Sequence, residues 1–211
     1  MVEFENTAEE VFLTNEANFV NINNIYYGGF QKWLYTEKVK SKFWANRSCG
    51  ITAASNIIVH MSMYKPRLRS LYPYSSLSKE NFIRIMKELF YYIKPTVMGI
   101  PTTGKMERGL KSFAKSKEII LESRSLTMSK DIDATIRFIK QGLKMNSPVL
   151  MVTWNSKIAN LKYHWVTITG YMKDIDGQNY IITSNWGEKE LFSLDNLIKD
   201  NSLYRGLVYF N

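Results

Sequence analysis

The sequence of 211 residues contains one cysteine and two histidines. One cysteine cannot form a disulfide within the chain, and together these three residues cannot supply the four ligands of a structural zinc site. No apolar run reaches the roughly 18 residues of a transmembrane helix, and residues Met1 to Asn6 lack the basic and then apolar order of a signal peptide. We therefore expect a fold held by packing, with no metal, no cofactor and no membrane span. A cytoplasmic location is favoured, although export stays open if the sequence is part of a longer chain.

Charge gives only a weak indication of a partner. The 28 Lys and Arg residues outnumber the 19 Asp and Glu residues, for a formal charge of +9, and hydrophobic residues make up an ordinary 45%. An excess of positive charge is compatible with an anionic substrate, a nucleic acid or a membrane surface. Because the basic residues are dispersed along the chain, a solvated surface explains them better, and nucleic-acid binding is kept only as an alternative.

Helical patterns dominate the first half of the chain and strand patterns the second. One helix is expected to begin at Cys49, a second to run from a Ser78 cap to about Ile93, and a third to begin at Thr103 as its cap. A fourth, capped by Ser129, and a short one, capped by Ser193, lie among the strands. The expected strands are 118–122, 149–154, 164–171, 180–183 and 207–210, with a hairpin turn at Asp176-Gly177.

This order predicts an α+β chain forming a single domain over residues 1–211. Residues 1–115 would form a mainly helical lobe, and residues 116–211 a mainly antiparallel sheet lobe packed against it. A cleft is expected between the two lobes.

Cys49 stands where a polar loop gives way to small and apolar residues that predict a buried helix. At the first turn of a helix, unpaired backbone N–H groups and a partial positive charge favour the thiolate, which is the nucleophilic form. Position alone also fits a small buried hydrophobic residue, which is what most free cysteines are.

A nucleophilic cysteine needs a base. His60 follows Cys49 by eleven residues on the same predicted helix, or about 16 Å along its axis, and is therefore expected to be a packed residue. His164 opens an apolar strand, and Asn185-Trp186-Gly187 closes the next strand. An amide at Asn185 could accept the ring N–H of His164 while Trp186 shields that bond from water.

These residues resemble the papain-like cysteine peptidases, and most closely the compact bacterial branch that includes the peptidases processing double-glycine leaders of bacteriocins. The resemblance covers about residues 43 to 198. The matching segments are Cys49-Gly50, Thr52-Ala53-Ala54, 148–152, 164–171 and Asn185-Trp186-Gly187. It implies a papain-like fold and a catalytic triad of Cys49, His164 and Asn185.

Two positions depart from the pattern of that family. A glutamine that helps to hold the oxyanion is expected six residues before the cysteine, where this chain has Phe43. Asn46 is the substitute that we expect, together with the backbone N–H of Cys49. The residue that orients the histidine is often three residues before the glycine, where Ser184 stands, so Ser184 is the alternative to Asn185.

The function predicted from the sequence is hydrolysis of a peptide or isopeptide bond in a peptide or protein substrate, through a thioester of Cys49. The alternatives are an acyltransferase and a non-catalytic peptide-binding module on the same fold. Trp44, Trp154 and Trp165 could line the substrate groove, although packing in the core explains each of them better. The sequence does not indicate an oligomeric state.

Overall fold

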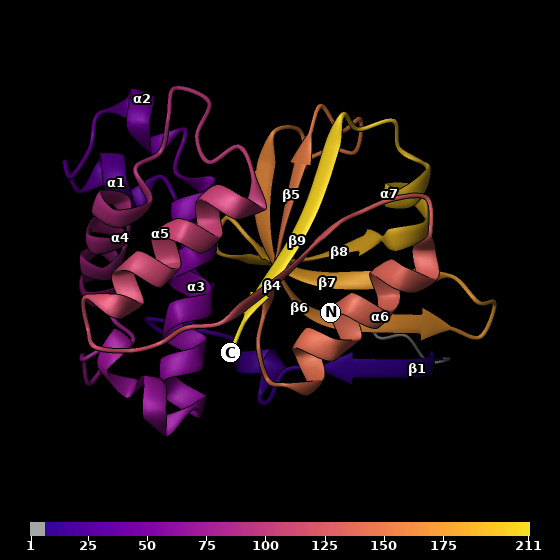
Figure 1. The fold of residues 1–211 in the computed structure, drawn as a ribbon, viewed down its shortest axis with the longest axis horizontal. Coiled ribbons are helices and arrows are strands. Elements are labelled where there is room, and N and C mark those ends of the chain that lie inside the picture. Colours follow the sequence, from indigo (N-terminus) through magenta and orange to yellow (C-terminus); the bar gives the residue numbers. More distant parts are fainter. Residues whose placement is uncertain (1–6) are drawn as a thin grey trace.

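The computed structural model describes residues 7–211 and has a mixed α+β architecture. Met1 to Asn6, on which the expectation of no signal peptide rests, lie outside the described residues. The helices are α1 (Trp33–Thr36), α2 (Lys42–Ala45), α3 (Cys49–Tyr64), α4 (Lys79–Ile93), α5 (Thr103–Lys115), α6 (Ile132–Lys144) and α7 (Leu194–Lys199). The strands are β1 (Thr7–Phe12), β2 (Asn21–Ile22), β3 (Tyr26–Tyr27), β4 (Ser123–Thr127), β5 (Val149–Trp154), β6 (His164–Asp174), β7 (Asn179–Asn185), β8 (Glu188–Ser193) and β9 (Tyr204–Phe210). Helices α1–α5 lie on one side of the molecule, and the large sheet with α6 and α7 lies on the other (Figure 1).

The large sheet has seven strands, and six of them follow the order β4-β9-β5-β6-β7-β8. Every pairing in it is antiparallel, as predicted. The long strand β6 pairs with β5 through residues 164–168 and then with β1 through residues 170–174. The first strand of the chain thus belongs to the sheet of the second half. The start of β6 lies within the sheet, between β5 and the end of β7.

Helix α3 lies between α4 and the sheet, in contact with β5 and β6 on one side and with α4 on the other. Every residue from Gly50 to Ser62 is buried, as expected of a helix whose sequence is apolar or small on all faces. Cys49 is the first residue of this central helix, so the position of the thiol is fixed by the core of the molecule. No helix among residues 7–211 is long and apolar enough to cross a membrane.

Helix caps were predicted well where the cap residue directly precedes the apolar pattern. Ser78 and Ser193 cap α4 and α7 as predicted, because their side chains accept the N–H of the third residue that follows. The caps predicted at Thr103 and Ser129 are wrong. The side chain of Thr102 caps α5, and that of Asp131 caps α6.

The strand predicted over 118–122 is also wrong, because β4 begins five positions later than predicted, at Ser123. The apolar run that suggested a strand has its middle residue, Ile120, 83% exposed. Instead, the more polar segment Ser123–Thr127 pairs with β9. Pairing with a neighbouring strand therefore outweighs apolar content in this segment. The strand β8, which follows Trp186-Gly187 directly, was not predicted.

Candidate active site

Cys49 begins α3 and faces the start of β6. The hydroxyl of the preceding Ser48 donates to the backbone oxygen of Trp44 and does not cap the helix, so the first turn of α3 has no side-chain cap. Gly50 permits close packing here: a Cβ on it would lie 2.7 Å from the Ile100 side chain and 3.1 Å from that of Trp165. The small residue after Cys49 thus lets the helix start approach the sheet.

The environment of the Cys49 thiol has opposing effects on its pKa. Burial of the sulfur among protein atoms raises the pKa, and this desolvation is the larger effect. Hydrogen bonds from backbone N–H groups lower it, first from Trp165 and then from Gly50 and Cys49 itself. The net pKa lies above the ordinary value for a thiol, so the resting side chain is a neutral thiol surrounded by backbone donors.

His164 is the first residue of β6, paired across the sheet with Thr153 of β5. Its Nε2 lies 2.7 Å from Oδ1 of Asn185, and the ring of Trp186 packs against the imidazole with centroids 4.8 Å apart. Burial lowers the pKa of His164 to about 4, and the bond to Asn185 opposes that shift only in part. The imidazole is therefore neutral at neutral pH.

Asn185 ends β7 and connects His164 to a carboxylate. Its Nδ2 donates to Oε2 of Glu190 over 3.0 Å, while its Oδ1 faces His164. A carboxylate can only accept, so Glu190 fixes which end of the amide points to the histidine. It follows that Nε2 of His164 carries the proton and that Nδ1 is the free basic nitrogen. The sequence did not single out Glu190, because it lies on the strand that was not predicted.

Ser184 and Asn185 have different partners. The hydroxyl of Ser184 donates to the backbone oxygen of Tyr27 over 2.7 Å and accepts Nδ2 of Asn56 over 3.2 Å. Of these two neighbours, it is Asn185 that bonds to His164.

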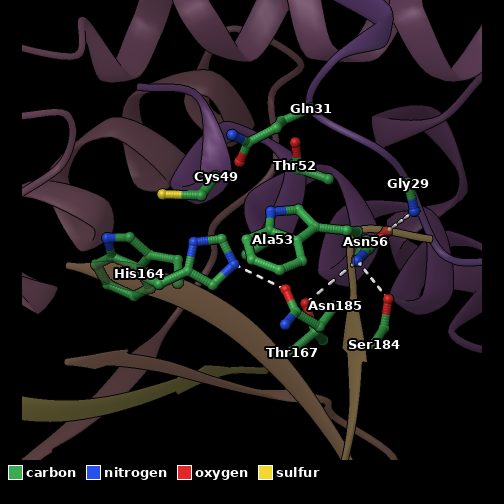
Figure 2. A pocket seen from close by; sticks show the side chains of 12 residues that line it. Gly29, Gln31, Cys49, Thr52, Ala53, Asn56, His164, Thr167, Ser184 and Asn185 are labelled. Atoms are coloured by element: carbon green, nitrogen blue, oxygen red, sulfur yellow. Dashed lines mark hydrogen bonds between the residues drawn. The ribbon is translucent and has the colours of Figure 1, made fainter. Parts of the chain in front are cut away.

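One small cavity brings Cys49, His164 and Asn185 together. Figure 2 shows Cys49 and the His164 ring at one end of it, with Asn185 on the far side of the ring. No hydrogen bond joins the Cys49 sulfur to His164 among the residues described. The group that most lowers the pKa of the thiol is the backbone N–H of Trp165, the residue that follows His164. Thiol and imidazole thus line the same cavity without a direct hydrogen bond between them.

Gln31 lies in this cavity, whereas Asn46 does not. The side chain of Gln31 extends from the segment before α1 towards Cys49 (Figure 2). Its Oε1 is buried and has no hydrogen-bond partner. Asn46 is exposed at the end of α2 and does not line the cavity. Phe43, at the position expected for glutamine, is 45% exposed. A sequence motif close to the cysteine could not reveal Gln31, because the chain between them forms α1 and α2.

The three tryptophans that were candidates for a groove differ in position. Trp165 lines the cavity, and with Trp154 it also lines a second cavity beside Cys49. The indole N–H of Trp165 donates to the backbone oxygen of Ile100 over 2.6 Å, and that of Trp154 donates to the backbone oxygen of Pro101 over 2.9 Å. These two bonds tie the loop before α5 to the sheet. Trp44 packs against Phe90 and lines neither cavity.

His60 is buried in α3, with its Nε2 3.0 Å from Oδ1 of Asn146 and its ring packed on Phe19 and Tyr64. It is a packed residue, as expected. No cluster of three or more His, Cys, Asp or Glu side chains suited to a metal ion occurs among residues 7–211.

The sequence matches no protein-family profile and no curated protein.

Proposed function

We propose that this protein is a cysteine peptidase of papain-like fold that hydrolyses a peptide or isopeptide bond. The observation that carries the proposal is that Cys49, His164 and Asn185 line one cavity, with His164 held through Nε2 by Asn185 and its Nδ1 left free. A thiol at the start of a buried helix, a neutral base and an amide that orients the base are the parts that thiol catalysis requires.

The pKa shifts support a particular starting state for the reaction. Desolvation raises the pKa of Cys49 and lowers that of His164 to about 4, so both side chains are neutral at pH 7. As the Cys49 sulfur attacks the carbonyl carbon, Nδ1 of His164 takes the thiol proton. The same nitrogen then donates this proton to the leaving amine. Water attacks the resulting thioester in the second step and releases the acid.

Gln31 is our candidate for the side chain that stabilises the oxyanion, in place of Asn46. The Oε1 atom of its carboxamide is buried without a partner in the cavity that contains Cys49, and a half-turn of the amide presents Nε2 as a donor there. The backbone N–H of Cys49, at the uncapped first turn of α3, is the second donor. Two fixed donors aimed at the developing negative charge lower the barrier for acyl transfer.

The experiment that tests the proposal is acylation by p-nitrophenyl acetate. We expect a burst of p-nitrophenol equal to the amount of enzyme and an acetyl group on Cys49, detected by mass spectrometry of the peptides. Cys49→Ala should abolish the burst. His164→Ala should slow it by about a hundredfold or more, because general-base catalysis contributes on the order of 10²–10⁴.

His60→Gln is the matched control, since it changes the other buried histidine and should leave the burst rate unchanged. Peptidase activity itself is measured on a mixture of peptides by mass spectrometry, with Cys49→Ala as the reference. The proposal fails if His164→Ala reacts as fast as the native enzyme, or if Cys49→Ala and the native enzyme yield the same peptides.

A further inference from the structure

A cavity with aromatic walls adjoins the candidate active site on the side of Trp186. Gln31 and Trp186 line both this cavity and the one that contains Cys49. Its remaining walls are Ile25, Tyr26, Phe30, Lys32, Gly187 and Glu188. Its volume of about 490 Å³ far exceeds the 10 Å³ around the catalytic side chains and the 30 Å³ of the cavity beside Trp165. Of these three adjoining spaces, it alone can hold a large side chain.

The aromatic walls of this cavity pack against the core and are tied to the sheet. The rings of Tyr26 and Phe30 both pack edge-on against Trp33, with centroids 5.0 and 6.3 Å away, and Trp33 is only 3% exposed. The backbone N–H of Tyr27 donates to the oxygen of Gly187 over 2.8 Å, which attaches the β2–β3 hairpin to the turn between β7 and β8. The cavity is therefore formed before any ligand binds, which reduces the entropy cost of binding.

The positions of the three cavities around Cys49 indicate which side of the scissile bond the aromatic cavity would face. Cys49 and Trp165 line both the central cavity and the small one, which lies on the side of the sulfur away from Trp186. Trp186, which borders the aromatic cavity, packs on the ring of His164. His164 must deliver a proton to the leaving amine, so that amine departs beside His164 and Trp186. The acyl part of the substrate then extends towards Trp165.

We propose that the aromatic cavity binds a large apolar or aromatic side chain of the residue on the leaving-group side of the scissile bond. This inference rests on the proposed function. The exposed apolar surface of Ile25, which is 75% exposed, and of Trp186, which is 37% exposed, loses water when such a side chain enters. Lys32 and Glu188 contribute opposite charges to the lining, so the cavity suits a neutral side chain.

The test uses the reverse direction of the leaving-group step. Acetyl-Cys49, formed with p-nitrophenyl acetate, is exposed to phenylalaninamide or to glycinamide. The amine nitrogen attacks the thioester carbon and loses a proton to His164, the C–N bond forms, and the C–S bond breaks to return the thiol. We expect phenylalaninamide to react about tenfold faster than glycinamide, because apolar contacts of this size discriminate by about that factor or more.

Two variants test the walls of the cavity. Tyr26→Ala should bring the ratio of the two rates close to one. Ile25→Ser, at an exposed position that the core does not need, should lower the ratio by about threefold. Tyr91→Ala and Ile175→Ser are the matched controls, since each changes an exposed apolar residue that lines none of the three cavities and should keep the native ratio.

The outcomes separate the two proposals. If acetyl-Cys49 forms but the native enzyme reacts equally fast with both amides, or with neither, the aromatic cavity is not the leaving-group site and the proposed function still stands. An unchanged ratio in both Tyr26→Ala and Ile25→Ser has the same meaning. If no acetyl group forms on Cys49, the proposed function fails and this inference fails with it.

Discussion

Residue by residue, the candidate site depends on which nitrogen of His164 is free. Asn185 donates to Glu190 through Nδ2 and accepts the Nε2–H of His164 through Oδ1, which orients the amide and leaves Nδ1 of His164 as the free basic nitrogen. Glu190 also accepts Nδ2 of Asn160 over 3.1 Å, so its carboxylate is held from two sides. The tautomer of the histidine is thus set by a residue that does not touch it.

Substitution of Glu190 tests this positioning role. In Glu190→Leu the Asn185 amide is free to rotate, and we expect kcat to fall about tenfold with little change in KM, as for loss of an outer partner of a functional histidine. Glu190→Gln should retain most activity, because its side-chain oxygen still accepts Nδ2 of Asn185. The fraction of each His164 tautomer, measured by ¹⁵N NMR, should change in Glu190→Leu alone. Equal tautomer fractions in the native and Glu190→Leu proteins would contradict this role.

Substitutions at Gln31 and Asn46 show which of the two side chains stabilises the oxyanion. Gln31→Ala should slow acylation of Cys49 by about 10²–10³, the usual effect of removing one oxyanion donor. Gln31→Glu has the same shape but no N–H to donate, and should be equally slow. Asn46→Ala, at an exposed position, should stay within about twofold of native. A slow Asn46→Ala beside a fast Gln31→Ala would reverse the assignment.

Among the elements, α3 organises the site through two of its residues. Cys49 begins the helix, and Asn56, on the same helix, bonds to three other segments. The Asn56 side chain accepts the N–H of Gly29 over 2.8 Å and donates towards Thr167 and Ser184 (Figure 2). Gly28 has φ +81°, and a Cβ there would lie 2.2 Å from the Ser184 hydroxyl. This turn leads directly to Gln31, so α3 positions both sides of the cavity.

Asn56→Leu should therefore destabilise the protein. The apolar side chain leaves the buried N–H of Gly29 without its partner, and we expect the free energy of unfolding to fall by about 1–3 kcal/mol in urea denaturation. Asn201→Leu, at an exposed position outside helices and strands, should change it by less than about 0.5 kcal/mol. Similar unfolding midpoints for native and Asn56→Leu would show that the Asn56 bonds add no net stability.

For the whole molecule, two neutral buried histidines make stability depend on pH. Burial lowers the pKa of both His60 and His164 from 6.5 to about 4. Above pH 6.5 the imidazoles are neutral in both the folded and the unfolded chain. As pH falls from 6.5 towards 4, the unfolded chain binds protons that the folded chain does not, so stability decreases across this window.

The expected loss is up to about 3 kcal/mol for each histidine, at 1.36 kcal/mol per pKa unit. Urea denaturation at pH 7.5, 5.5 and 4.5 measures it. His60→Gln should reduce the slope with pH, because one of the two titrating groups is gone while an amide remains beside Asn146. A free energy of unfolding that is constant from pH 7.5 to 4.5 would contradict the assignment of neutral histidines.

Local sequence patterns determined much of the molecule. The apolar spacing and Ser78 cap predicted α4, the β-branched run predicted β5 with its observed bounds, and the small and apolar residues after Cys49 predicted α3. These signals are local because capping bonds and buried faces involve residues a few positions apart. The relation of Cys49 to His164 and Asn185 was also expected from the sequence, since each stands at the end of a predictable element.

Only the tertiary structure decided which residues complete the site and its surroundings. Gln31 lines the cavity instead of Asn46 because Asn56 holds the Gly28-Gly29 turn. Glu190 bonds to Asn185 because β8 folds back on β7, and Ser123–Thr127 is a strand because β9 offers it a partner. Contacts between residues far apart in the chain depend on how elements pack and pair, and that arrangement leaves no pattern within any one segment.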